Sequence, residues 1–314
     1  MHLPFTTFDV FTSTRYLGNP LAIVCVPRAL RSQLTESRKQ AIATEFNLSE
    51  IVFLHEVPKG EDGEGEVADY DIFTARSRIS FAGHPTVGTS IYIARHRNEY
   101  AGVKKLRTVA GLVEFVYSEE GGGTASVKVP HDVHIHKARL PHPLPSPDMN
   151  PTSSTTVPLV SIVKGMAFNL VPLSTLEALG SVSEGLVPVA DVFACEYLDK
   201  GSGWDAGLTG TFYFVDLGCD PDSPDRQLLR TRSIGSREDP GTGSASAALC
   251  SYLALQEGVE KGRGPFEFHL VQGVEMGRRC DIFVSVVRKA GGREIEEIRL
   301  KGAAVEVMEG VIEV

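Results

Sequence analysis

The chain has 314 residues, of which 42% are hydrophobic and 23% are charged, and its formal net charge at pH 7 is −9. This length is too great for one typical core and predicts two domains, while the composition is that of an ordinary globular protein. The negative charge argues against nucleic acid or an anionic membrane as the main partner.

The chain carries no sign of a membrane or secretory segment. It lacks a run of about 18 apolar residues, the length that a transmembrane helix needs. Its start, MHLPFTTFDVF, has no basic stretch followed by an apolar core, so no secretory signal is expected. The five cysteines are scattered and form no CxxC pair, which is typical of reduced thiols in a cytoplasmic protein.

Strand-like apolar stretches dominate the first half of the chain, at 8–11, 21–26, 51–55, 68–73, 112–117 and 125–129. Two helices interrupt them. The first is expected at about 32–46, where Leu34, Ala41 and Ile42 form one apolar face. The second, 83–95, is apolar nearly all round and is therefore expected to be enclosed on every side.

The second half repeats this pattern, with strands expected at 159–163, 191–197, 211–217, 228–234, 266–271 and 282–287, and one helix at 243–256. Between the halves, 141–158 is rich in proline, serine and threonine, so we expect a linker or an excursion there. Too few helices are present for a parallel α/β sheet. The pattern predicts an α+β fold with two curled, mostly antiparallel sheets, each enclosing one helix.

The segment 238–256 is the most informative for function. Glu238 and Asp239 are followed by Gly241-Thr242-Gly243-Ser244 and then by an apolar helix. Free backbone N–H groups and small side chains at such a helix start favour binding of a substrate carboxylate or enolate. Asp239 would lie beside that anion, where it could serve in acid/base chemistry.

A second helix start follows the same plan. Gly83-His84-Pro85-Thr86 opens the 83–95 helix, with proline in the first turn, where it loses no hydrogen bond. The two motifs lie about 160 residues apart. They predict two related halves, each presenting a helix N-terminus, and one carboxylate-bearing substrate held between the two ends.

Glu45 lies at the C-terminal end of the first helix. A solvent-facing side chain is the usual outcome at such a position. If Glu45 projected into an apolar cleft instead, its raised proton affinity would suit a proton shuttle.

Three other kinds of site are less favoured: a metal site, a nucleotide-binding site and the active site of a serine hydrolase. The neighbouring histidines His131, His134, His136 and His142 could bind a metal, but no nearby carboxylate or cysteine completes a ligand set, so a solvated strand end is expected. The stretch GTGSASA lacks the Lys-Ser/Thr of a P-loop, and no GxSxG nucleophile elbow is present.

The chain resembles the PhzF family of phenazine-biosynthesis proteins, which share the diaminopimelate epimerase-like fold. The similar segments span nearly the whole length: Gly18-Asn19-Pro20-Leu21-Ala22, Thr44-Glu45-Phe46-Asn47-Leu48-Ser49-Glu50, Phe81-Ala82-Gly83-His84-Pro85-Thr86, Glu238-Asp239-Pro240-Gly241-Thr242-Gly243-Ser244-Ala245, Gln272-Gly273, Glu275-Met276-Gly277-Arg278 and Gly302-Ala303-Ala304-Val305.

The resemblance implies two domains, 1–130 and 131–299, each a β-barrel around a central helix, with 300–314 returning to the first and a proline-rich excursion at 141–158. It implies proton transfer without a cofactor or metal, with Glu45, Asp239 and His84 as catalytic residues. Gly83, Thr242, Gly243 and Ser244 would bind the substrate. No cysteine stands at either helix start, so a two-thiol racemase is not expected.

One departure concerns Arg78, which stands where relatives usually have a glutamate. Substrate recognition is expected to differ there, or the loop to serve another purpose. The leading expectation is an isomerase of secondary metabolism acting on a small carboxylate. The alternatives are an epimerase at a carbon next to a carboxylate and a catalytically silent binding protein. A homodimer is one possible state, and the substrate stays open.

Overall fold

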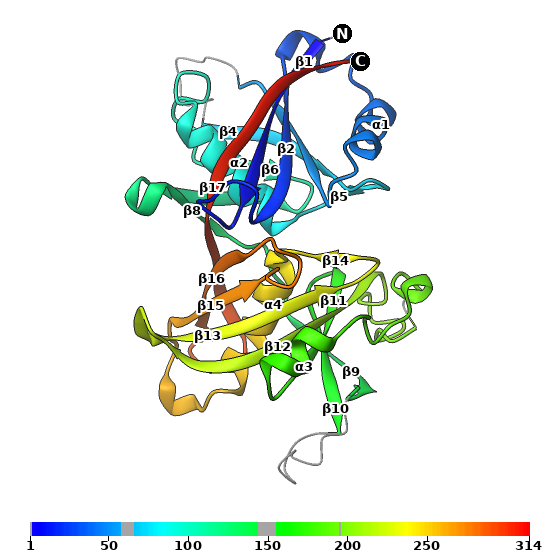
Figure 1. Cartoon of the computed structure of the whole chain (residues 1–314), viewed down its shortest axis with the longest axis vertical. Coiled ribbons are helices and arrows are strands. Elements are labelled where there is room, and N and C mark those ends of the chain that lie inside the picture. The colour runs from blue at the N-terminus through cyan, green and yellow to red at the C-terminus, as the bar shows by residue number, and fades with distance from the viewer. Residues whose placement is uncertain (1, 58–65, 144–154, 195) are drawn as a thin grey trace. The chain divides into compact units, whose positions relative to one another are not determined.

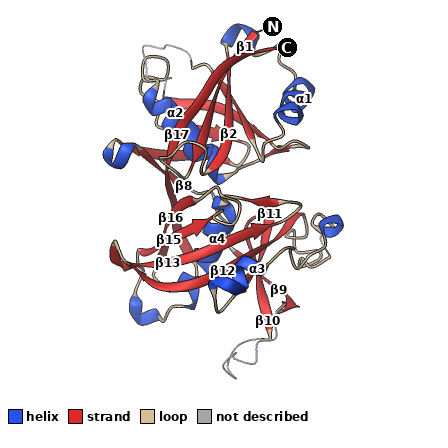
Figure 2. Cartoon of the chain, in the orientation of Figure 1, coloured by secondary structure: helices blue, strands red, loops and turns tan. Residues whose placement is uncertain are grey.

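The computed structural model of the chain describes residues 2–57, 66–143, 155–194 and 196–314 (Figure 1). Strands make up most of its regular structure and helices are few, as Figure 2 shows. The mostly β character predicted from the sequence is confirmed. Within the described ranges, no helix is both long enough and apolar enough to cross a membrane.

The chain divides into two compact units, which are taken one at a time below. Unit 1 comprises Met1–Pro130, Gly277–Ile282 and Arg299–Val314, and unit 2 comprises His131–Met276 and Phe283–Ile298. The domain boundaries read from the sequence stay a prediction. Gly277–Ile282 belongs to unit 1 although it lies inside the region that the sequence assigned to the second domain.

Unit 1 is built on a mixed sheet. β1 (His2–Val10) pairs antiparallel with β2 (Asn19–Val26) and with the part of β17 (Ile295–Glu313) that belongs to unit 1, while β3 (Ile51–His55) runs parallel to β2. The other strands of this unit are β4 (Val67–Phe73), β5 (Arg78–Ile79), β6 (Lys105–Thr108), β7 (Gly111–Ser118) and β8 (Thr124–Lys128). β8 pairs antiparallel with both β7 and β17.

α2 (Gly83–Arg95) is the enclosed helix of unit 1. Every residue from Gly83 to Ile93 is buried, and α2 contacts β1, β2, β3, β7 and β8. Gly88 permits a close approach, because a Cβ there would lie 2.5 Å from Leu21 Cδ2 and 2.9 Å from Val10 Cγ2. The bounds and the enclosure predicted for this helix are confirmed.

α1 (Glu36–Phe46) packs on β3 and β4, and Ile42 and Ala43 are buried against the core. It begins after Thr35, whose side chain accepts the N–H of Arg38, and it ends at Asn47, which has a left-handed φ of 49°. The predicted start at about 32 was too early, because the capping hydroxyl belongs to Thr35.

Unit 2 repeats the mixed design. Its strands are β9 (His134–Pro141), β10 (Thr156–Val163), β11 (Gly165–Pro172), β12 (Gly207–Asp220), β13 (Ser223–Ile234), β14 (Glu238–Asp239), β15 (Phe266–Gln272) and part of β16 (Cys280–Arg288). Most neighbours are antiparallel, but β11 runs parallel to β12 and β13 runs parallel to β15. α3 (Leu176–Ser181) packs on β12 and β13.

α4 (Gly243–Gln256) is the enclosed helix of unit 2. Its residues from Gly243 to Ser251 are buried, and it contacts β10, β11 and β15. The predicted bounds, 243–256, are confirmed. Arg288, which is wholly buried, satisfies the far end of the helix by donating hydrogen bonds to the carbonyl oxygens of Ala254 and Glu257.

In unit 2 one predicted strand is wrong, and of the two alternatives for 141–158 the described ends favour an excursion over a linker. The strand predicted at 191–197 is absent from the described part of that range, where a 3-10 turn at Val189–Asp191 is followed by further turns. The ends of the proline-rich segment 141–158 do join a strand ladder, because Pro141 pairs with Thr156 and Arg139 with Pro158. The segment therefore lies within unit 2, and its part 144–154 lies outside the described residues.

Candidate active site

The start of α2 gathers polar side chains from three segments of unit 1. His84 is buried in the first turn, and its Nδ1 lies 3.4 Å from Asn19 Nδ2 at the start of β2. The same Nδ1 lies 3.7 Å from Glu50 Oε2. Ala82, which precedes the helix, offers no side-chain cap to its N–H groups. This helix start therefore combines backbone donors with an imidazole and a carboxylate.

Glu50 reaches this position because the chain turns sharply after α1. Asn47 ends the helix in the left-handed conformation, and Leu48 packs against the core cluster of unit 1. Glu50 then stands directly before β3, with 19% of its side chain exposed against 4% for His84. Ser49 donates a hydrogen bond to Asn19 Oδ1 at 3.4 Å, which links the same turn to β2.

Glu45 lies elsewhere in unit 1. It is exposed and lines a pocket of about 290 Å³ together with Arg38, Ile42, Phe46 and the C-terminal residues. His84 and Asn19 are not among the residues that line this pocket. The structure therefore brings Glu50, rather than the predicted Glu45, beside His84.

Arg278 fixes the turn that leads into Asn19. Its guanidinium donates to the carbonyl oxygen of Gly18 at 2.9 Å and to Asp9 Oδ1 at 2.5 Å. The Glu275–Arg278 motif of the sequence thus supplies Arg278, which holds the start of β2 in place.

In unit 2, the start of α4 is held by a polar network. Thr242 Oγ1 donates to Asp239 Oδ2 at 2.5 Å. Gln272, which is fully buried on β15, donates to the Asp239 carbonyl oxygen at 2.7 Å and accepts the N–H of Thr242 at 3.1 Å. Gly243 and Ser244 are buried in the first turn of α4. The sequence singled out Gln272 only as part of a motif and assigned it no role.

Arg78 belongs to a cluster of charged side chains around Asp71. Its guanidinium pairs with Asp71, which also accepts hydrogen bonds from Lys39 Nζ at 2.5 Å and from His55 Nε2 at 2.9 Å. Burial alone would raise the pKa of Asp71, but hydrogen bonds from His55 and Lys39 and the charges of Lys39 and Arg78 hold it well below its usual range. The residue that departs from the family pattern is thus engaged by a carboxylate of its own unit.

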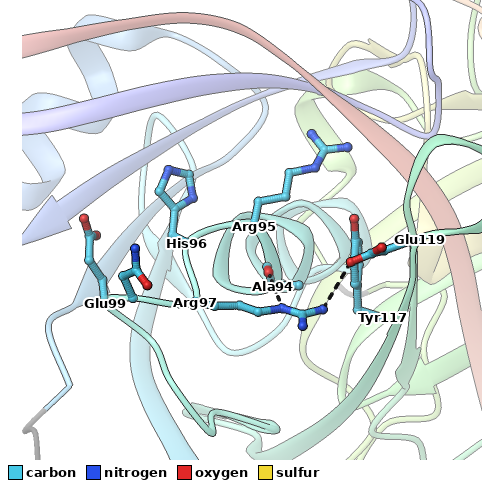
Figure 3. A pocket seen from close by; sticks show the side chains of 8 residues that line it. Ala94, Arg95, His96, Arg97, Glu99, Tyr117 and Glu119 are labelled. Carbon is cyan, nitrogen blue, oxygen red and sulfur yellow. Dashed lines mark hydrogen bonds and ion pairs between the residues drawn. The ribbon is translucent and has the colours of Figure 1, made fainter.

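The pocket in Figure 3 lies at the opposite end of α2 and has a volume of about 460 Å³. Arg97 crosses it, donating to the carbonyl oxygen of Ala94 at 3.1 Å and pairing with Glu119 at 3.4 Å (Figure 3). His84 precedes Arg95 by 11 residues, or about 17 Å along a helix. This pocket is therefore separate from the group around His84.

The histidine cluster is only partly brought together. His134 and His136 lie beside Asp199, whereas His142 Nε2 lies 2.7 Å from the carbonyl oxygen of Pro172. The solvated strand end that the sequence favoured is wrong for His136, which is 1% exposed. The carboxylate that the sequence pattern lacked comes from a loop 63 residues further along the chain.

Comparisons with known proteins agree with this architecture. A model of the phenazine biosynthesis-like protein family (PhzC-PhzF) matches residues 8–198 and 224–310. The chain is 27% identical to trans-2,3-dihydro-3-hydroxyanthranilate isomerase of Pseudomonas fluorescens, over 98% of both chains. It is 28% identical to an uncharacterized isomerase of Mesorhizobium japonicum, over 98% of this chain and 97% of that one.

Solved structures share the fold. A PhzF-family protein of Bacillus anthracis matches with a TM-score of 0.73 and 20% identity, over the whole of both chains. A hydroxyproline epimerase from Agrobacterium vitis, with bound trans-4-hydroxy-L-proline, matches with a TM-score of 0.64 and 14% identity, over 99% of this chain and 92% of that one. Family model and relatives together identify the chain as an isomerase that belongs to the phenazine biosynthesis-like protein family.

Proposed function

We propose that this isomerase moves a proton between carbon atoms of a small carboxylate-bearing metabolite without a cofactor, and that Glu50 is its acid and base. The observation that carries the proposal is the Glu50 carboxylate 3.7 Å from His84 at the start of α2. The role that the resemblance gave to Glu45 passes to Glu50, because Glu45 lines an outer pocket with other partners.

The chemistry needs one group that accepts a proton from one carbon and returns it to another. A carboxylate on a short turn between α1 and β3 can do both if the two carbons lie within its reach. His84 and the N–H groups at Gly83 and His84 would hold the substrate, because a helix N-terminus attracts a carboxylate and stabilises charge that develops on it.

Unit 2 offers a second helix start of the same kind. Asp239 is fixed by Thr242, and the first turn of α4 supplies the buried residues Gly243 and Ser244. We propose that Asp239 orients the substrate and that the N–H groups of Gly243 and Ser244 bind an anionic group. Both helix starts lack cysteine, so a carboxylate, rather than a thiol pair, is the proposed acid and base.

The names of two relatives support a proposal for the substrate class. Full-length relatives from Pseudomonas fluorescens and Pseudomonas aeruginosa are named trans-2,3-dihydro-3-hydroxyanthranilate isomerases. That compound is a small ring bearing a carboxylate and an amine. We propose substrates of this class, and trans-2,3-dihydro-3-hydroxyanthranilate itself is the first probe.

The test compares turnover by the wild type, Glu50→Gln and Glu45→Gln on that probe and on a set of related cyclic amino carboxylates. Glutamine keeps the shape of glutamate but cannot carry the proton. We expect Glu50→Gln to lower kcat by at least about 10²-fold, the low end of general acid–base catalysis, while substrate binding persists. The matched control, Glu45→Gln, should leave kcat unchanged. Loss of turnover in Glu45→Gln alone would restore the original assignment.

A further inference from the structure

Two histidines and one aspartate converge in unit 2. His134 and His136 are alternate residues of β9, so their side chains project from the same face of the strand. Asp199, in the loop before β12, places Oδ2 2.9 Å from His134 Nε2 and 3.9 Å from His136 Nδ1. One ligand atom from each residue lies within 4.8 Å of the other two.

The protonation state of His136 follows from its neighbours. Its Nδ1 lies 3.2 Å from the backbone N–H of Asp199, which can only donate, so Nδ1 is an acceptor and carries no proton. The proton is therefore on Nε2, which donates to Ser161 Oγ at 2.8 Å. The ring is thus neutral, and a neutral imidazole is the form that binds a metal ion.

Surrounding groups hold the three side chains in this arrangement. Ser161 orients the His136 ring through its far nitrogen, as partners of metal-bound histidines do. The N–H of Lys137 donates to Asp199 Oδ1 at 3.0 Å, which leaves Oδ2 facing the two rings. Trp204 stacks on His134, with ring centroids 4.7 Å apart and an interplanar angle of 8°.

We propose that His134, His136 and Asp199 form a binding site for a divalent transition-metal ion of the zinc class, in addition to the isomerase site. Zn²⁺ bonds to imidazole nitrogen and carboxylate oxygen are about 2.0–2.2 Å long, so tetrahedral ligand atoms lie roughly 3.3–3.6 Å apart. The distances of 2.9 and 3.9 Å from Asp199 Oδ2 to the two nitrogens need only small rotations to match.

The donor set also selects the class of ion. Mg²⁺ and Ca²⁺ prefer oxygen ligands, and Cu⁺ prefers sulfur, whereas two imidazoles with one carboxylate suit Zn²⁺, Co²⁺ or Ni²⁺. On binding, the ion would replace the 3.2 Å bond from the Asp199 N–H to His136 Nδ1 and the 2.9 Å bond from His134 Nε2 to Asp199 Oδ2. The proton on His134 Nε2 would move to its other ring nitrogen or to solvent. It would tie the loop that carries Asp199 to β9 and leave a fourth position for water. This site is independent of the isomerase activity proposed above.

The direct test is titration of the chelator-stripped full chain with Zn²⁺ in competition with a chromophoric chelator. We expect one ion per chain, with affinity lowered by at least about 10-fold in His134→Ala and Asp199→Ala, since loss of even a supporting partner costs that much. The matched control is His142→Ala, which removes a histidine from the same part of the chain but not from the site. It should bind Zn²⁺ as the wild type does.

Two further measurements distinguish the loss of a metal ligand from a general structural effect on the loop that carries Asp199. Ser161→Ala removes no ligand and should weaken Zn²⁺ binding while the protein stays folded. Histidine ¹⁵N spectra should show coordination at His134 Nε2 and at His136 Nδ1. The proposal is overturned if Zn²⁺ fails to bind at one ion per chain, if Asp199→Ala binds as tightly as the wild type, or if the ¹⁵N signals of both rings stay unchanged.

Discussion

Gln272 holds the residues just before α4 through both ends of its side-chain amide. It donates to the Asp239 carbonyl oxygen at 2.7 Å and to Thr242 Oγ1 at 3.1 Å, and it accepts the N–H of Thr242 at 3.1 Å. Because Gln272 is fully buried, removing it would take a hydrogen-bond partner from the Asp239 carbonyl oxygen and from the Thr242 N–H at a partly buried position.

We therefore predict that Gln272→Ala lowers the free energy of unfolding by about 1–3 kcal/mol and also lowers kcat, because Asp239 is no longer held in place. Urea unfolding and steady-state kinetics measure the two effects. Gln33→Ala is the control, since the Gln33 side chain is exposed and donates to the nearby Ala29 carbonyl oxygen. Equal urea midpoints for Gln272→Ala and the wild type would contradict the role given to Gln272.

Near the candidate site, the sequence correctly predicted the features that short local motifs determine. The helix starts at Gly83 and Gly243 lie where the glycine-rich motifs placed them. The sequence analysis singled out Glu45 and gave Glu50 no role, whereas the structure places Glu50, on the turn after Asn47, beside His84. The sequence pattern gives no sign of which of the two carboxylates then faces β2 and α2.

At the scale of elements, α2 packs closely against its neighbouring strands at Gly88. A Cβ at this position would meet Leu21 Cδ2 at 2.5 Å and Val10 Cγ2 at 2.9 Å, both from core strands. We predict that Gly88→Ala lowers the free energy of unfolding by about 1–3 kcal/mol, the usual effect of overpacking.

A glycine in α3 supplies the control. A Cβ on Gly180 would meet no atom within 4 Å, so Gly180→Ala should stabilise the protein by about 0.4–1 kcal/mol through a less flexible unfolded chain. Urea unfolding of both variants measures the contrast. If Gly88→Ala were as stable as Gly180→Ala, the close packing of α2 against β1 and β2 would be refuted.

α1 is anchored to the sheet of unit 1 by the ion pair of Lys39 with Asp71. The pKa of Asp71 is lowered in the folded protein, so its stabilising contribution is fully present above the unfolded value of about 4. That contribution is lost as the pH falls below this value toward the folded pKa.

We predict that Asp71→Asn destabilises the protein at pH 7, because Lys39 is left buried without its partner, and that it flattens the fall in stability below about pH 4. Urea unfolding across that pH range measures both effects. Asp225→Asn, at an exposed position, is the control and should follow the wild-type pH profile. A wild-type profile for Asp71→Asn would show that this ion pair does not govern acid stability.

Elements were predictable where the apolar pattern alone decides the structure. The helices α2 and α4 are apolar all round, and their predicted bounds match the structure. The stretch 191–197 has a strand-like pattern, yet Asp191 donates its N–H back to Pro188 and closes a turn instead. β11 was missed, although it pairs antiparallel with the neighbouring β10 as well as parallel with β12, 42 residues further along the chain.

At the scale of the whole chain, one plan occurs twice. Each unit contains a nearly fully buried helix, and the start of that helix carries the residues proposed to bind the substrate. The model of the phenazine biosynthesis-like family matches most of both units. The pairing of His84 with a carboxylate distinguishes the first helix start from the second and makes Glu50 the proposed proton carrier.

The most direct test of that claim is transfer of solvent deuterium into substrate and product. Because a proton held by Glu50 exchanges with solvent before it returns to carbon, the wild type in deuterium oxide should place label on carbon, as mass spectrometry would show. Glu45→Gln should do the same at the wild-type rate, and Glu50→Gln should incorporate label at least about 10²-fold more slowly. Incorporation by Glu50→Gln at the wild-type rate would contradict the account and make Asp239 the first candidate base.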